Sequence, residues 1–399
     1  MPDPIPLIHL AQNRSTLLAP RRNPLLWKTK NPEKTKLLLS PSRRVFPSSY
    51  SPCLLTTFLP ALKMKAMKIL VRVPNWLGDA VLAIPAIKDL HYNFSHDQIV
   101  IMGQPWAQDL YSPLGFISEF VSLGKINHLR DFFSFAQNLH QQQFELGLLL
   151  TNSFSSAFLF SLARIPQRWG YSQDGRRLLL TRAPSPPAGP VHQVEYYRQL
   201  LLALECRLSS DDSEVFSLPL PEDPRQRDAL AEAFQLDKKK PWIIFHPGAA
   251  YGPAKRWPAR HFAQLAELLA QKNAEIVLVG TQKEFALGAQ ISSLAPFPLK
   301  NLCGRTSLPQ LIKLIQQAHL VVANDSGPLH LANLVRTPVV ALFGPTDPRQ
   351  TGPFRPPAQV LKKPAPCWPC WYRTCPFDHR CLTSITPEEV LASAEKFLN

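Results

Sequence analysis

The sequence has no uninterrupted apolar run of about 18 residues, so we expect no membrane-spanning helix. Its seven cysteines in 399 residues are too few to frame a disulfide scaffold. It contains no Asp-x-Asp triplet, which argues against a diphosphate held through a carboxylate-bound metal ion. With 45% hydrophobic and 18% charged residues, the chain can bury a core, and its length predicts two to three domains.

Acidic residues are scarce: 29 Asp and Glu stand against 44 Lys and Arg, a formal charge of +15. Residues 1–66 hold 11 basic and 2 acidic residues, a net of +9, so most of the basic excess lies in this segment. It also has ten prolines, no glycine and no sustained periodicity. We therefore expect a disordered or spurious N-terminal extension, with a translation start at Met64 or Met67. A targeting peptide, or a basic arm for anionic membranes or nucleic acid, are the alternatives.

From Lys68 onward, short β-branched runs alternate with amphipathic stretches, a pattern typical of parallel sheets covered by helices on both faces. The expected strands are residues 69–73, 99–102, 146–150, 242–245, 276–279, 320–323 and 339–343. The expected helices are residues 81–90, 154–163, 194–204, 262–271, 308–318 and 329–334. We predict an α/β protein with two doubly wound, Rossmann-like domains, 67–238 and 239–399, facing each other across a cleft. Ligands of such sheets bind beyond the carboxyl ends of the strands, so the cleft is the expected site.

Four polar motifs directly follow expected strands. The first, residues 74–79, places Asp79 at a helix start, as either an N-cap or a general base directed into the cleft. The second, residues 246–258, combines small residues with Lys255 and Arg256. It is neither a Walker A nor a Gly-x-Gly-x-x-Gly loop, yet close backbone and cations suit a diphosphate. The alternative is an ordinary loop with a solvated basic pair.

The third motif ends in Glu284, which would either hold ribose hydroxyls or be a first-turn acid favoured by the helix dipole. The fourth, residues 324–330, opens a helix whose free N–H groups and Ser326 hydroxyl suit an anion. Within it, an N-cap role is the alternative for Asp325, and a packed core histidine is the alternative for His330.

Together, and in this order, these motifs resemble glycosyltransferase family 9, the ADP-heptose:lipopolysaccharide heptosyltransferases, and most of all its heptosyltransferase II members. The resemblance covers roughly residues 67–399 and leaves 1–66 unmatched. The matching stretches are residues 76–79, 152–154, 163–166, 247–249, 252–258, 324–327 with His330, and 341–346.

The resemblance implies the GT-B fold and an inverting transfer of heptose from ADP-L-glycero-D-manno-heptose to the heptosyl-Kdo-lipid A inner core, in lipopolysaccharide core biosynthesis. ADP-heptose would bind the C-terminal domain and the acceptor the N-terminal domain. Asp79 would be the catalytic base. The donor and its phosphates would be bound by Lys255, Glu284, Asp325, Ser326, Gly327 and His330. The protein's own donors would stabilise the leaving diphosphate, so no cofactor is required for catalysis.

Two other functions remain open: a related family 9 transferase, such as heptosyltransferase I or one with another sugar or acceptor, and a catalytically inactive sugar-nucleotide-binding protein. Retention of Asp79 argues against the inactive protein. No RNA- or DNA-binding motif accompanies the basic charge, so we expect no nucleic-acid partner.

The acceptor would be strongly anionic, and a run of arginines in the N-terminal domain suits its carboxylates and phosphates. These residues are Arg164, Arg168, Arg176, Arg177 and Arg182, and the family-like stretch before them adds Asn152. A solvated surface run is the alternative. Such a cluster would also hold the enzyme peripherally on the inner, cytoplasmic face of the inner membrane.

Four cysteines lie close together near the C-terminus, spaced Cys367-x2-Cys370-x4-Cys375-x5-Cys381. The first pair has metal-ligand spacing, and four thiolates make a possible structural zinc site. Reduced structural thiols and a local disulfide are the alternatives.

Overall fold

Lys68–Arg72 forms β1, the central strand of the first sheet, in a computed structural model that describes residues 66–124, 128–221 and 223–398. This sheet is parallel, in the order β3-β2-β1-β4-β5. Its other strands are β2 (Gln98–Gly103), β3 (Ile117–Ser122), β4 (Leu146–Leu149) and β5 (Gln167–Trp169). β1 is the point where the strand order reverses, so the segments after β1 and β4 meet at one edge.

The second sheet is also parallel, in the order β11-β10-β9-β6-β7-β8. Its strands are β6 (Trp242–His246), β7 (Glu275–Leu278), β8 (Lys300–Asn301), β9 (Leu320–Asn324), β10 (Val339–Phe343) and β11 (Ala358–Lys362). The central strands β6, β9 and β10 are buried along their whole length. The order again reverses at β6, which brings the segments after β6 and β9 side by side.

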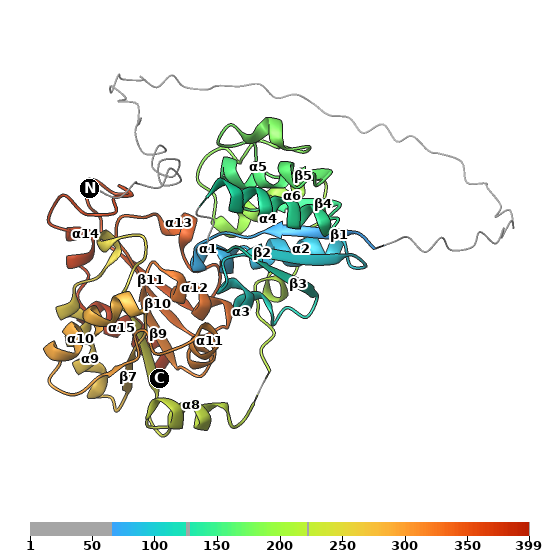
Figure 1. Cartoon of the computed structure of the whole chain (residues 1–399). Coiled ribbons are helices and arrows are strands. Elements are labelled where there is room, and N and C mark those ends of the chain that lie inside the picture. Colours follow the sequence, from blue (N-terminus) through green and yellow to red (C-terminus); the bar gives the residue numbers. More distant parts are fainter. Residues whose placement is uncertain (1–65, 125–127, 222, 399) are drawn as a thin grey trace, which may run out of the picture. The chain divides into compact units, whose positions relative to one another are not determined.

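Helices connect the strands and cover both sheets (Figure 1). Those that follow the first-sheet strands are α1 (Leu77–Leu82), α2 (Ile84–Asn93), α3 (Ala107–Tyr111), α4 (Leu129–Gln141), α5 (Phe154–Leu162), η3 (Arg176–Leu179) and α6 (Gln193–Ala203). The connection to the second sheet carries α7 (Asp212–Val215) and α8 (Gln226–Phe234). The helices that follow β6, with η marking 3-10 helices, are η4 (Pro253–Lys255), α9 (Ala259–Ala270), η5 (Gln282–Glu284), α10 (Phe285–Leu294), α11 (Leu308–Gln316), α12 (Gly327–Leu334), α13 (Pro348–Thr351), α14 (Arg380–Thr383) and α15 (Pro387–Leu398).

Successive side chains of a strand point to opposite faces of the sheet, so the hydrophobic core is divided into separate clusters. In β1, Ile69 and Val71 face one hydrophobic cluster and Leu70 faces another. In β10, Val339 and Ala341 belong to the same cluster as Ile69, while Val340 belongs to a third. One face of each sheet therefore shares a continuous core with the other sheet, through the helices that lie between them.

The predicted fold class is confirmed, and all seven predicted strands are present within one or two residues. The predicted helix over 81–90 is wrong in its start: the chain forms α1 and α2 there, joined at Ala83. The prediction for residues 1–66 lies outside the described residues, except for Ala66. The predicted domain boundary at 238/239 lies between β5, of the first sheet, and β6, of the second. The boundary itself stays a prediction.

A buried ion pair joins two helices that pack on β1. Arg198 of α6 donates from Nε to Asp89 Oδ2 of α2 at 2.8 Å, and the second oxygen of Asp89 accepts from Ser209 N at 2.8 Å. Asp89 is fully buried and Arg198 nearly so. Buried carboxylates are tolerated when every oxygen is paired, and this pair meets that condition.

We expect Asp89→Ala to lower the free energy of unfolding by roughly 3–5 kcal/mol, because Arg198 then keeps only partners that are largely solvated. The exposed pair between Lys238 and Asp228 provides the control, since Asp228→Ala should change stability by less than about 1 kcal/mol. Urea-induced unfolding of the three proteins measures both effects. Equal losses in the two variants would contradict the importance of burial here.

Candidate active site

α1 places Asp79 in its first turn, directly after β1. Arg72, the last residue of β1, donates to Asn75 Oδ1 at 2.6 Å and so shapes the connecting loop. Trp76 occupies the N-cap position of α1, and its side chain makes no capping hydrogen bond. The N-cap alternative for Asp79 is therefore wrong, because Asp79 lies three residues further along.

α1 packs closely against the start of α12, which follows β9 in the second sheet. A Cβ atom at Gly78 would lie 2.9 Å from His330 Cδ2, and one at Gly327 would lie 2.8 Å from Leu77 Cδ2. Both glycines are therefore required by this approach. It brings Asp79 of the first sheet next to the motif at residues 324–330 of the second.

His330 is a buried side chain of this helix contact. Burial lowers the pKa of His330 to about 4, so the imidazole is neutral at pH 7. In the described part of the chain, its Nδ1 atom has no hydrogen-bond partner. The core-histidine alternative fits this environment, and a contact between His330 and the donor stays a prediction.

Lys255 and Asp325 form a buried ion pair. Lys255, in η4, approaches Asp325 Oδ2 with its Nζ at 2.5 Å. The same carboxylate oxygen accepts a hydrogen bond from Thr346 Oγ1 at 2.6 Å. Asp325 therefore holds the cation in place, and its alternative as an N-cap is wrong because Ser326 is the N-cap of α12. Thr346 follows β10, and we did not single it out from the sequence, although it lies in the matched stretch 341–346.

Asp79 lies in the electrostatic field of that ion pair. Burial raises the pKa of Asp79 to about 6, Lys255 opposes the rise and Asp325 adds to it. No described residue donates a hydrogen bond to the Asp79 carboxylate. A carboxylate that titrates near neutrality and has free lone pairs is suited to accept a proton.

Ser326 and Glu284 meet at His246, the last residue of β6. Ser326 Oγ lies 2.9 Å from His246 Nδ1 and donates to the Asn324 carbonyl at 2.8 Å. Glu284 Oε2 lies 3.8 Å from His246 Nε2. A Cβ atom at Gly248 would lie 1.7 Å from Glu284 Oε1, so the carboxylate packs directly beneath the loop after β6.

Glu284 also closes a capping box, accepting from Thr281 N at 2.7 Å and Thr281 Oγ1 at 2.9 Å. Burial would raise the pKa of Glu284, but the hydrogen bonds and charge of His246, with those of Thr281, outweigh it and lower the pKa to about 2. Glu284 is therefore a first-turn acid, as one of the two alternatives predicted, and its contact with the ribose stays a prediction.

Asn324 fixes the loop that carries Lys255. Its amide Nδ2 donates to the carbonyls of Pro247 at 2.8 Å and Gly248 at 3.3 Å, and its Oδ1 accepts from Trp257 N at 3.1 Å. One buried side chain thus holds both ends of the loop. The sequence signal for Asn324 was its position at the carboxyl end of a buried strand.

The model of glycosyltransferase family 9 (heptosyltransferase) matches residues 132–380 of this chain. The chain belongs to this family. Lipooligosaccharide heptosyltransferase 2 of Haemophilus ducreyi is 32% identical over 312 residues, which cover 74% of this chain and 88% of that protein. Lipopolysaccharide heptosyltransferase 2 of Escherichia coli K12 is 30% identical over 351 residues, covering 83% and 99%. The structure of E. coli ADP-heptose lps heptosyltransferase II aligns with a TM-score of 0.69 at 28% identity, covering 83% of this family 9 chain and 98% of that one.

The predicted acceptor side of this family 9 protein begins after β4. Asn152 donates to the Tyr196 hydroxyl at 2.8 Å and accepts from Arg176 Nη2 at 3.2 Å. Arg176 is fully buried and also donates to the carbonyls of Thr151 and Tyr171. Arg176 is therefore not a surface cation as the sequence suggested: it is an internal brace that orients Asn152.

The other arginines divide into two groups. Arg168 donates to the carbonyls of Leu179 and Ile165, each at 2.6 Å, and Arg182 is paired with Glu205 at 3.2 Å. Arg164 and Arg177 are exposed to solvent. The predicted cluster is thus not one surface, and its exposed members alone are suited to bind an anionic acceptor.

We expect Lys255 and Asp325 to show strong energetic coupling in a double-mutant cycle. Lys255→Met and Asp325→Asn each leave one buried group without its partner and should each lower the free energy of unfolding by roughly 3–5 kcal/mol. The double variant should lose less than the sum of the two, because no charge is then left unpaired. Denaturant unfolding of the four proteins measures the coupling, and simple additivity would contradict the ion pair.

Proposed function

We propose that this protein transfers heptose from ADP-L-glycero-D-manno-heptose to the heptosyl-Kdo-lipid A inner core, with inversion, in lipopolysaccharide core biosynthesis. Membership in family 9 and relatives named heptosyltransferase 2 support the reaction class. The observation that carries the proposal is the proximity of Asp79, on the first sheet, to the Lys255–Asp325 pair on the second. Inverting transfer requires a base opposite the leaving group and a group that stabilises the leaving diphosphate, and in this proposal the two sheets supply one each.

In this mechanism, Asp79 accepts the proton of the acceptor hydroxyl as that oxygen forms a bond to the anomeric carbon. The bond between the anomeric carbon and the diphosphate oxygen breaks on the opposite face, and ADP leaves. Lys255 and the N–H groups at the start of α12 stabilise the negative charge that develops on the diphosphate. The Ser326 hydroxyl turns back to the Asn324 carbonyl, which leaves those N–H groups to the ligand. With these donors present, we propose that transfer requires no divalent metal ion.

We further propose that the enzyme works on the inner, cytoplasmic face of the inner membrane through an aromatic surface on α4 and α5. Among the described residues, no helix is both long and apolar enough to cross a bilayer. Phe132 stacks on Phe158 with ring centroids 5.8 Å apart, and Phe158 stacks on Phe154 at 6.0 Å. Phe133 packs edge-on against Phe132 at 6.4 Å.

Solvent reaches much of this aromatic surface, since Phe133 is 52% and Phe154 49% exposed. Leu178, in η3 beside α5, is 94% exposed, and the residue before it, Arg177, is also exposed. Exposed aromatic rings next to a cation suit the interface of an anionic bilayer. α5 also starts directly after Asn152, so the same surface leads from the lipid to the predicted acceptor residues.

Asp79→Asn tests the catalytic proposal. Transfer should fall by roughly 10²–10⁴-fold, because the amide cannot accept a proton. Wild-type kcat/KM should fall as the pH decreases through about 6, where Asp79 becomes protonated. Because folding raises the pKa of Asp79 from 3.8 to about 6, its ionisation lowers the stability of the wild type as the pH rises between these two values, so Asp79→Asn should be at least as stable as wild type at pH 7.

The assay is mass spectrometry of products from ADP-heptose with mono-heptosylated Kdo-lipid A, run beside the unheptosylated acceptor. Transfer to the first acceptor alone supports the proposal. Transfer only to the second would assign the protein to the preceding heptose addition, and near-normal turnover by folded Asp79→Asn would remove Asp79 as the base.

The membrane proposal predicts that Phe133→Ser combined with Phe154→Ser weakens binding to anionic phospholipid vesicles severalfold, because exposed rings no longer enter the interface. Leu294→Ser, which removes a 52% exposed apolar side chain from α10, is the matched control. Vesicle co-sedimentation measures binding, and transfer to a detergent-solubilised acceptor checks that the site is intact. Equal binding by both variants would contradict the assignment of this surface.

A further inference from the structure

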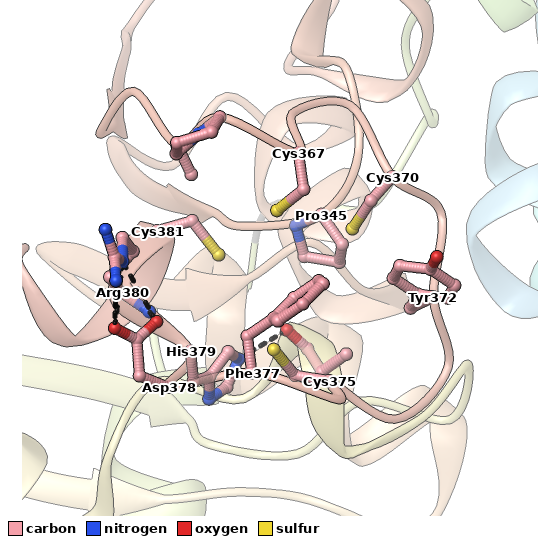
Figure 2. A pocket seen from close by; sticks show the side chains of 13 residues that line it. Pro345, Cys367, Cys370, Tyr372, Cys375, Phe377, Asp378, His379, Arg380 and Cys381 are labelled. Carbon is pink, nitrogen blue, oxygen red and sulfur yellow. Dashed lines mark hydrogen bonds and ion pairs between the residues drawn. The ribbon is translucent and has the colours of Figure 1, made fainter.

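The chain between β11 and α14 forms neither helix nor strand and carries Cys367, Cys370 and Cys375, which line one cavity together with Cys381 of α14. The cavity measures about 250 Å³, and Figure 2 shows the side chains of Cys367, Cys370, Cys375 and Cys381 around it. All four are free thiols. Cysteine supplies four of the thirteen residues that line this space.

This segment, residues 363–381, has little core of its own. Tyr372 is 46% and Phe377 64% exposed, and only Cys381 among the four cysteines is buried. Proline is frequent along the segment and prevents regular hydrogen bonding. A bound metal ion would add stability to a segment of this kind.

The cysteine-rich segment lies directly behind the loop that holds Lys255. Ala254 N donates to the Arg373 carbonyl at 3.0 Å, and His379 Nε2 lies 2.6 Å from the Ala254 carbonyl. A Cβ atom at Gly252 would lie 2.3 Å from the Arg373 carbonyl oxygen, so the two backbones touch.

The same segment supports the loop after β10. Cys370 N and Trp371 N both donate to the Pro345 carbonyl at 3.1 Å, and Trp368 Nε1 donates to the Thr346 carbonyl at 3.1 Å. Thr346 is the residue whose hydroxyl bonds Asp325. The segment therefore fixes the surroundings of both members of the Lys255–Asp325 pair.

We infer that Cys367, Cys370, Cys375 and Cys381 bind one Zn²⁺ ion as four thiolates, and that this ion holds the cysteine-rich segment against the Lys255 loop. Four cysteines in a tetrahedron form the closed coordination typical of a structural zinc site, with sulfurs at about 2.3 Å from the metal. Residues 367 and 370 have the spacing of a chelating pair. Zn²⁺ binding displaces the four thiol protons to solvent and leaves a net charge of −2 on the site.

The inference requires a local adjustment. Across the described residues, no three Cys, His, Asp or Glu side chains already converge closely enough to hold a metal ion. The four cysteines border the same cavity, and Cys367, Cys370 and Cys375 lie outside any helix or strand. Rotation of the cysteine side chains, with small shifts of this segment, would bring the sulfurs together.

The first test is the metal content of the purified full chain, measured by mass spectrometry of the elements. We expect one zinc per chain in wild type, and loss of most of it in Cys367→Ser and in Cys375→Ser. Cys206→Ala removes a cysteine far along the chain from the cluster and should retain the zinc. Co²⁺ replacing Zn²⁺ should produce the intense near-ultraviolet absorption of cobalt thiolates in wild type and Cys206→Ala alone.

The second test is hydrogen–deuterium exchange at the Ala254 amide, which donates to the Arg373 carbonyl. Exchange there should accelerate after chelation and in Cys375→Ser, relative to the amides of the central strand β1. This readout stays usable if one variant loses stability, because chelation acts on the wild-type protein.

Several results would overturn the inference: wild type that takes up no zinc, zinc retained by both serine variants, iron in place of zinc, or disulfides among the four cysteines in the native protein. Unchanged exchange at Ala254 after zinc removal would refute the support of the Lys255 loop. None of these measurements requires heptose transfer, so a zinc-bound protein without transferase activity would refute the proposed function alone.

Discussion

The close contact between α1 and α12 is the constraint on which the candidate active site depends. Gly78 and Gly327 have no side chains of their own at this contact, so the two helices approach closely and the carboxylate of Asp79 lies in the field of a cation carried by the other sheet. A methyl group at Gly78 would meet the ring of His330, and the helices would have to separate. The electrostatic coupling between Asp79 and Lys255 would then weaken with distance.

One cation lies near two carboxylates, and the difference between those carboxylates defines their roles. Asp325 Oδ2 contacts Lys255 Nζ at 2.5 Å and the Thr346 hydroxyl at 2.6 Å, so this oxygen already has partners within the protein. Asp79 is left with burial as the main influence on its pKa. The first carboxylate is therefore a positioning group, and the second is available to take a proton.

The sequence was informative where strands are central and where a polar residue directly follows one. Buried strands such as β1, β6 and β9 read as continuous apolar runs, and the motifs after them were placed correctly. The edge strand β3 escaped notice because its residues Glu119 and Ser122 are exposed and break the apolar run. Composition also cannot separate a buried arginine from a solvated one: Arg176 and Arg177 are neighbours in the chain, yet one is buried and the other exposed.

The hydrophobic cluster shared by both sheets has a consequence for how the molecule unfolds. Ile69 and Val71 of one sheet and Val339 and Ala341 of the other lie in a single continuous core, together with the helices between them. Neither sheet can lose its packing without exposing apolar surface that belongs to the other. Heating should therefore melt the two halves in one cooperative transition, and an intermediate with one sheet intact should not accumulate.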